Sequence, residues 1–149
     1  MTSVNARVVE FLNSHRVINL AYADLEGKIQ CCALWYAADA QLNLYVLSSL
    51  STQHGKALQS GGEIAFTINK DQQHWKSITG VQGRGRIRLL DADHHAFDTY
   101  AAKFSFILEQ FSGLEAALEE TRIWKIRPTW VRLIDNSLGF GHKDELELS

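Results

Sequence analysis

Proline, cysteine and methionine are scarce in this sequence of 149 residues, which has one proline, two cysteines and one methionine. It also lacks any run of about 18 apolar residues, so no membrane-spanning segment and no membrane partner are expected. Charged residues make up 21% of the chain, the net charge is −2, and no block of like charge occurs. The sequence therefore gives no reason to expect a nucleic-acid partner.

The usual sequence signs of catalysis are missing as well. There is no Ser-His-Asp order with a nucleophile elbow and no phosphate-binding P-loop, because the glycine-rich "GVQGRG" at 80–85 is expected within a strand. His94 and His95 are adjacent, with no cysteine or carboxylate at ligand spacing, so no metal site is expected. Any chemistry would have to come from a bound cofactor.

Cys31 and Cys32 are neighbours within an apolar run. Adjacent cysteines rarely bond to each other, and two apolar-flanked thiols are typical of small core residues in a reducing compartment. The sequence thus predicts a cytoplasmic protein. The first sixteen residues place Val4, Val8 and Phe11 at helical spacing between polar residues, which predicts an amphipathic helix and not a signal peptide.

With 46% apolar residues, the chain is expected to form one domain over 1–149, mainly β with peripheral helices. Period-two patterns predict strands at 17–24, 29–37, 42–48, 63–69 and 78–90, and a further strand region at 122–143 that bends at Pro128. A short helix is expected at 52–60, stopped by Gly61 and Gly62, followed later by a helix whose apolar face runs from Phe97 to Leu108 and another piece at 114–118. Consecutive hairpins favour an antiparallel barrel or sandwich of six or seven strands.

The stretch "VLSSLSTQHGKALQSGG" at 46–62 is the most distinctive one, because an apolar strand ends there in four hydroxyl side chains and a histidine. One interpretation is a helix capped by Thr52. The other is a phosphate seat, in which backbone N–H groups and the hydroxyls would hold an anion, His54 and Lys56 would add positive charge, and Gly55 would let the anion approach. The local pattern alone leaves both open.

The order of helix, hairpin, third strand, hydroxyl-rich turn and short helix resembles the FMN-binding split β-barrel of the pyridoxamine 5′-phosphate oxidase superfamily. The resemblance implies a six- to seven-stranded antiparallel split barrel that binds FMN between two subunits of a homodimer. Ser48 matches the hydroxyl residue that ends the third strand, Thr52 the following Ser/Thr, and Gln53 and His54 the phosphate-gripping pair. The cofactor-binding residues that the resemblance implies are Ala33, Leu34, Trp35, Leu47, Ser48, Ser49, Thr52, Gln53, His54 and Gln82.

A second likeness lies near the end of the chain. "DNSLGFG" at 135–141, "GVQ" at 80–82 and the Thr52-Gln53-His54 triplet resemble a small bacterial family of functionally uncharacterised split-barrel proteins. Departures from the oxidase are equally visible: Cys31-Cys32-Ala33 stands where an arginine reaches the phosphate, and Gln-His replaces Arg-Lys. The oxidase's Arg-x-His substrate motif is absent too, so pyridoxine phosphate oxidation is not expected.

These resemblances together imply an FMN-binding protein, an oxidoreductase acting on an unknown small substrate. A non-enzymatic flavin or small-anion binding module, acting as a carrier or regulator, is the alternative from a different class. A split barrel that uses haem or a deazaflavin is the third. The sequence does not distinguish among these three functions.

Overall fold

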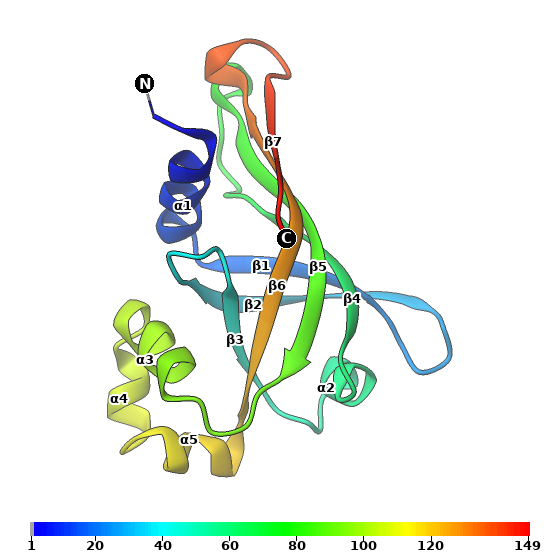
Figure 1. Ribbon diagram of the computed structural model, residues 1–149, viewed down its shortest axis with the longest axis vertical. Coiled ribbons are helices and arrows are strands. Elements are labelled where there is room, and N and C mark those ends of the chain that lie inside the picture. The colour runs from blue at the N-terminus through cyan, green and yellow to red at the C-terminus, as the bar shows by residue number, and fades with distance from the viewer. Residues whose placement is uncertain (1) are drawn as a thin grey trace.

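Seven antiparallel strands form one continuous sheet in the computed structural model, which describes residues 2–149 (Figure 1). Their order is β3-β2-β1-β4-β5-β6-β7, and β3 also pairs with β6, so the first six strands close into a barrel and β7 extends it. The strands are β1 (Val17–Ala23), β2 (Ile29–Ala38), β3 (Leu44–Ser48), β4 (Gly62–Ile68), β5 (Thr79–Leu89), β6 (Arg122–Asp135) and β7 (Lys143–Glu147). The predicted antiparallel split β-barrel is confirmed.

The core follows directly from the period-two alternation of the strands. On β1, Ile18, Leu20 and Tyr22 are buried inside the barrel while their neighbours face outward. The register between β5 and β6 shifts at Gly85, opposite Pro128, and a Cβ on Gly85 would lie 2.3 Å from the carbonyl oxygen of Arg127. Glycine is required there because the backbone of β6 passes so closely, and this shift is the predicted bend at Pro128.

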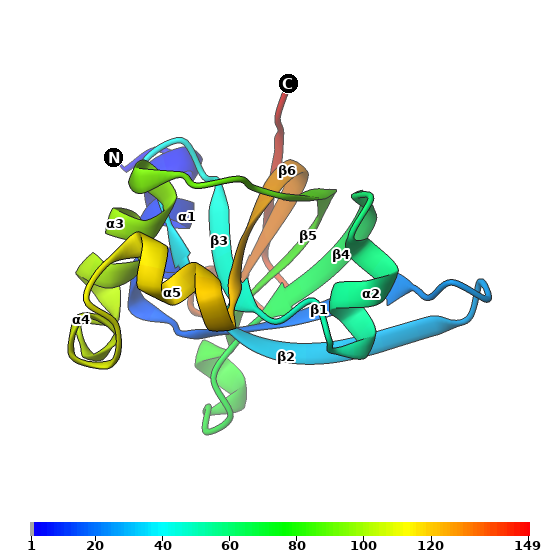
Figure 2. The same ribbon diagram turned by 90° about the horizontal axis from the view of Figure 1, so that it is seen from below.

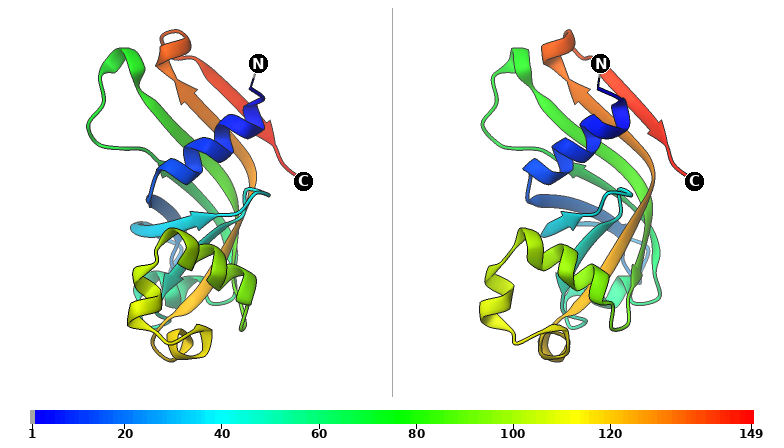
Figure 3. Two further views of the ribbon diagram at one scale, coloured as in Figure 1. Left: turned by 90° about the vertical axis from the view of Figure 1, so that its left-hand side faces the viewer. Right: turned by 60° about the vertical axis from the view of Figure 1, so that its left-hand side comes forward.

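The helix α1 (Val4–Ser14) runs diagonally across the barrel beside β7, as Figure 3 shows. Ser3 caps its first turn by accepting a hydrogen bond from the backbone N–H of Ala6, and its apolar face buries Val8, Phe11 and Leu12, as the spacing predicts. At its other end, the Tyr36 hydroxyl donates to the carbonyl oxygen of Leu12 at 2.7 Å. No helix among residues 2–149 is long and apolar enough to cross a membrane.

Three further helices, α3 (His94–Lys103), α4 (Phe106–Gln110) and α5 (Leu114–Glu120), pack on one side of β3, and α2 (Gln53–Leu58) lies on the other (Figure 2). The prediction of one helix with an apolar face from Phe97 to Leu108 is wrong at its end. Phe104 leaves the helical conformation and turns its ring into the cluster under α3, and a new helix starts after Ser105. Leu108 is consequently 56% exposed.

The prediction that both cysteines are core residues is wrong for Cys31. Consecutive strand residues point to opposite faces of a sheet, so a pair can be buried only where both faces are covered. At this part of β2 the outer face is bare, and Cys31 is exposed. Cys32 points inward and is half-buried, and burial raises the pKa of its thiol to about 11.

Candidate cofactor-binding site

The end of β3 and the start of α2 bring Ser48 and His54 together. The Ser48 Oγ lies 2.5 Å from Nε2 of His54, and both side chains point into the end of the barrel. With Leu34 from β2, they line a narrow apolar hollow whose other walls include Val46 and Trp124, and it leaves no room for a water molecule. Three of the residues predicted to bind a cofactor thus lie on the inner side of the sheet.

The surroundings of His54 favour its neutral form. Burial lowers the pKa of its imidazole below the ordinary value of 6.5, and the edge of its ring lies against Tyr22, with centroids 6.4 Å apart. The carbonyl oxygen of Ser48 is occupied as well, since it accepts a hydrogen bond from Trp124 Nε1 at 3.3 Å. The sequence alone suggested a cation that faces a phosphate, whereas the structure places the imidazole against a hydroxyl inside the barrel, where burial lowers its pKa.

The hydroxyl-rich turn between β3 and α2 satisfies most of its own polar groups. Thr52 caps α2 by accepting a hydrogen bond from Gly55 N at 3.0 Å, and it donates to the carbonyl oxygen of Ser49 at 2.8 Å. Gly55 is buried, and a Cβ there would lie 2.2 Å from that same Ser49 oxygen. Gly55 therefore makes room for the turn's own backbone. The groups left at the surface are the hydroxyls of Ser49 and Ser51, 2.8 Å apart, and the exposed side chain of Gln53.

The outer side of the same strands has a different character. Trp35 is 44% exposed, stacks on Phe104 with ring centroids 4.9 Å apart, and meets the edge of Phe106 at 5.7 Å. Its partner on β1 is the exposed Val17, and Ala33 lies on the same face of β2. We call these exposed residues, Val17, Ala33, Trp35 and Phe106, the aromatic shelf.

The shelf lies near the hydroxyl-rich turn. Leu34 and Ser48 line one hollow on the inner side, so their sequence neighbours occupy the outer side of the same corner. Leu47 is one of these neighbours, and its side chain packs beside the cluster under α3. Phe104, which lies under the shelf, and Phe106, which belongs to it, were not predicted as site residues. The only signal for them in the sequence was their aromatic type in a predicted helix beside the barrel.

Gln82 lies farther away than the other predicted residues. The register links Ala33 to Asn19, Asn19 to Thr67 and Thr67 to Gln82, so all four share one row on the outer face. Three steps between strands separate Gln82 from Ala33 by about 14 Å. Gln82 accepts a hydrogen bond from Arg132 Nη1 at 3.4 Å. A ligand ring lying on the shelf of one chain would not also touch Gln82 of that chain.

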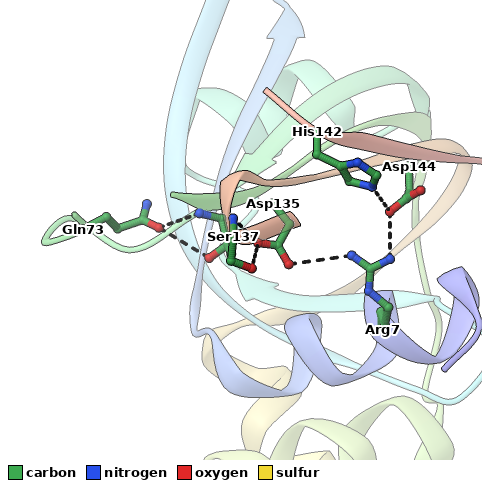
Figure 4. A network of polar contacts seen from close by, with 7 residues as sticks. Arg7, Gln73, Asp135, Ser137, His142 and Asp144 are labelled. Carbon is green, nitrogen blue, oxygen red and sulfur yellow. Dashed lines mark hydrogen bonds and ion pairs between the residues drawn. The ribbon is translucent and has the colours of Figure 1, made fainter. Parts of the chain in front are cut away.

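The strand region predicted at 122–143 is wrong beyond Asp135, where β6 ends, because the "DNSLGFG" segment turns through a short 3₁₀ helix at Asn136–Leu138 and forms a tip. Figure 4 shows polar contacts at this tip. Asp135 accepts hydrogen bonds from the N–H and hydroxyl of Ser137, at 3.0 and 2.5 Å. Arg7 of α1 lies 3.7 Å from the Asp135 carboxylate and 2.7 Å from that of Asp144, which His142 also contacts at 3.0 Å. These contacts hold α1 against the segment and against β7, so the segment has a structural role.

Among residues 2–149, no group of three or more histidines, cysteines or carboxylates could hold a metal ion. The shelf offers a flat apolar surface to an aromatic ring, and the turn offers neutral donors to an anion. The donor set therefore fits the ring of a flavin well and its phosphate only in part, because Gln53 is uncharged and His54 points inward. Lys56 of α2 is exposed, as its predicted role requires.

Solved structures that share the split-barrel fold of this chain include a protein of the pyridoxine phosphate oxidase family and two haem proteins. A protein of that family from Clostridium acetobutylicum, related to general stress protein 26, superposes with a TM-score of 0.66 at 13% identity and covers 97% of this chain and 94% of its own. A haem-binding protein of Mycobacterium smegmatis gives 0.76 at 15% identity, covering 99% and 59%, and the haem storage protein HutZ of Vibrio cholerae gives 0.68 at 13%, covering 85% and 91%. At these identities the likeness shows the fold.

Sequence relatives narrow the class to one family. The UPF0306 protein YhbP of Salmonella paratyphi A is 33% identical over 122 residues, and a UPF0306 protein of Klebsiella pneumoniae is 31% identical over 121 residues; each match spans 79% of this chain and 76% of the relative. No family model matches. The chain belongs to the UPF0306 family, which confirms the resemblance to a small bacterial family of split barrels.

Proposed function

We propose that this protein is a cytoplasmic homodimer that binds FMN and serves as a flavin-dependent oxidoreductase for a small substrate. The observation that carries the proposal is the aromatic shelf. An exposed tryptophan that is backed by Phe104 presents a flat surface on which the planar ring of a flavin can stack. The hydroxyl-rich turn beside it supplies neutral donors for the anionic end of the same ligand.

Within this proposal some of the predicted site residues contact the ligand, and others only support the turn. Ala33, Trp35 and Leu47 would contact the flavin ring, and Ser49 and Gln53 would donate to the phosphate. Leu34, Ser48, Thr52 and His54 would hold the turn in place from behind without touching the ligand. Gln82 would act only from the second subunit, given its distance of about 14 Å from Ala33 in one chain. Bound FMN would supply the hydride or electron transfer.

The homodimer is supported by a bare sheet face. Val17, Ile29, Cys31, Ala33 and Ala65 are all exposed on the outer side of β1, β2 and β4. Leu25 and Ile29, each 79% exposed, lie on the β1–β2 hairpin that projects from the barrel (Figure 1). A second copy would cover this face and bury more than about 1,200 Å². Sedimentation of a stable monomer at micromolar concentration would refute both the dimer and a site shared between subunits.

Haem is the second candidate ligand, because two of the structural neighbours are described as a haem-binding and a haem storage protein. A porphyrin would also lie flat on the shelf. It would need an axial ligand, and His54 is an unfavourable one because its Nε2 is engaged by Ser48 inside the barrel.

A reconstitution experiment separates the candidates. Purified protein is mixed with FMN, riboflavin or haemin, excess ligand is removed, and the absorbance spectrum is recorded. The proposal expects retained flavin absorbance with FMN and less with riboflavin, followed by bleaching on addition of NADPH if the protein is an enzyme. A retained Soret band with no retained flavin would establish haem instead. FMN that no reductant bleaches would indicate a carrier.

A further inference from the structure

A cluster of four cations lies on the outer face of the barrel, away from the aromatic shelf. Arg86 and Arg88 of β5 stand opposite Arg127 and Lys125 of β6, in two neighbouring cross-strand pairs. All four face outward, because Ile87 and Ile126 between them are buried. Like charges directly opposite each other destabilise an antiparallel pair. We call this set, Arg86, Arg88, Lys125 and Arg127, the basic groove.

The groove is poorly neutralised within the protein. Arg86 lies 3.6 Å from Glu63, but both side chains are mostly exposed, so that ion pair contributes little. Arg127 donates to a main-chain oxygen of Ser149, the last residue of the sequence, at 2.7 Å. The side chains of Arg88 and Lys125 make no hydrogen bond or ion pair in the described part of the chain.

Nearby carboxylates are engaged elsewhere. Asp93 and Arg88 both lie close enough to Tyr45 for their charges to affect the pKa of its phenol. Tyr45 pairs with Lys125 across β3 and β6, so Asp93 is a carboxylate near the groove. Asp93, however, caps α3 by accepting from Ala96 N at 2.9 Å, and Asp39 accepts the Tyr45 hydroxyl at 2.8 Å. Neither carboxylate forms an ion pair with a cation of the groove, so the four cations outnumber Glu63, the carboxylate beside them, although the chain as a whole carries a net charge of −2.

Two other arginines of the same strands have partners that offset their charge. Arg84 and Arg132 both lie over the Trp130 ring, 4.4 and 4.9 Å from its centroid. Arg132 also pairs with Glu145 at 2.8 Å. Those arginines are held by an aromatic ring and a half-exposed carboxylate at 2.8 Å, whereas the cations of the basic groove have only the weak, exposed contact between Arg86 and Glu63.

The groove is also hollowed. A cavity of about 300 Å³ lies between its four cations and the Ser60–Gly62 turn that follows α2. A second one of about 380 Å³ adjoins it, shares Lys125 and Arg127, and reaches Asn43 and Pro128. Figure 1 shows α2 beside the end of β5, where the first cavity lies. The combined space matches the size of a small-molecule site.

We propose that the basic groove binds a small polyanion with two or more phosphoryl groups, such as a nucleoside diphosphate or inorganic pyrophosphate. The two cation pairs lie about 6.7 Å apart along the strands, so a ligand with several anionic groups engages both pairs at once. Arginine forks match phosphate oxygens in geometry as well as in charge. No aromatic side chain lines either cavity, which disfavours single-stranded nucleic acid, since that ligand stacks its bases.

The test uses the full chain and titrates it with pyrophosphate, ADP and orthophosphate by calorimetry at matched ionic strength. Pyrophosphate should bind at least about tenfold more tightly than orthophosphate, and its affinity should fall steeply as salt rises from about 50 to 200 mM. Equal affinities for ADP and pyrophosphate would mean that the groove recognises the phosphoryl groups alone. A higher affinity for ADP would mean that the groove also contacts the nucleoside. Pyrophosphate that binds no better than orthophosphate, or an oligonucleotide that outcompetes both, would overturn the proposal.

The double variant Arg88→Gln with Lys125→Gln gives a readout that a structural role would not produce. Removing one charge from each side relieves repulsion, so its melting temperature without ligand should equal or exceed that of the wild type. Its pyrophosphate affinity should nevertheless fall at least about tenfold. Arg84→Gln, two residues away on the same face but outside the groove, is the matched control and should bind as the wild type does. A double variant that melts lower and binds pyrophosphate normally would contradict the proposal. FMN affinity should be unchanged in both variants, which keeps this test separate from the flavin proposal.

Discussion

The two sides of the corner formed by β2, β3 and the following turn differ in almost every respect. On the inner side, Leu34, Ser48 and His54 close a hollow without room for water, and the single polar pair is bonded at 2.5 Å. On the outer side, Trp35 and Val17 remain exposed although they are large and apolar. The inner side has neither space nor free polar groups for a ligand, while the outer side has an exposed apolar surface that a ligand or a second subunit could cover.

This contrast shows how a strand can serve the fold and a ligand with alternate residues. Side chains that point inward are constrained by packing, and those that point outward are free to meet a ligand or a second subunit. The ten residues predicted from the resemblance mix the two sets, because a family motif records positions along the chain and not the side of the sheet on which each one lies. Changing one residue on each side should therefore produce opposite patterns of stability and binding.

Gly55→Ala should have the largest effect on the inner side. The new Cβ would lie 2.2 Å from the backbone oxygen of Ser49, and backbone cannot move aside as a side chain can. The start of α2 would have to shift, which should lower the free energy of unfolding by about 2–3 kcal/mol. Urea unfolding measures this loss. Gly62→Ala is the control, since the nearest atom is 3.9 Å away, and an equal loss in both variants would show that the Ser49 contact is not the cause.

Ser48→Ala should be the next most damaging change. It leaves Nε2 of His54 without its partner inside the barrel, at a cost of about 1–2 kcal/mol. Ser49→Ala, one residue away on the open side, should cost less than about 0.5 kcal/mol, because water replaces its partner. Thermal or urea unfolding of both variants decides the matter. Equal losses would mean that the two sides of the corner do not differ.

Acidification should weaken the inner side specifically. The pKa of His54 is lower in the folded protein than the ordinary 6.5, so below that pH the unfolded chain binds more protons. The contribution of neutral His54 to stability is complete above about pH 6.5 and is lost as the pH falls through the lower folded pKa. The variant His54→Gln should lose this part of the pH dependence. His74→Gln, at an exposed position, should keep it. Identical stability profiles for wild type and His54→Gln between pH 7 and 5 would refute the assignment.

The barrel could be predicted from the sequence because its physical cause is local. Alternation of apolar residues located β1 to β5 within two residues at each end. The predicted helix at 52–60 ends two residues early, at Leu58, and Gly62 already begins β4. The break at Phe104 could not be predicted, because the helical pattern of apolar residues continues to Leu108 and only the packing of the Phe104 ring ends the helix. Nor could the final strand β7, whose sequence Lys143–Glu147 is mostly charged and which forms by pairing with β6.

The candidate site was predicted in part for a related reason. The Ser48–Gly55 turn was found because hydroxyls cluster there, and its cap by Thr52 is as predicted. The direction of His54 was missed because sequence gives no sign of whether a side chain at the first turn of a helix points into the barrel or outward. The support of Trp35 by Phe104 joins residues 69 positions apart, and such a contact depends on the fold.

FMN titration of two tryptophan variants tests the central claim, that the outer side of the corner is the ligand site, most directly. Trp35→Ala removes the exposed ring of the aromatic shelf and should weaken FMN binding about tenfold, with a loss of stability of only about 1 kcal/mol. Trp75→Ala removes an equally exposed ring at the distant tip, where it contacts Phe140, and should leave FMN affinity unchanged. Quenching of flavin fluorescence gives both dissociation constants. Equal affinities for wild type and Trp35→Ala, or a loss confined to Trp75→Ala, would contradict the account.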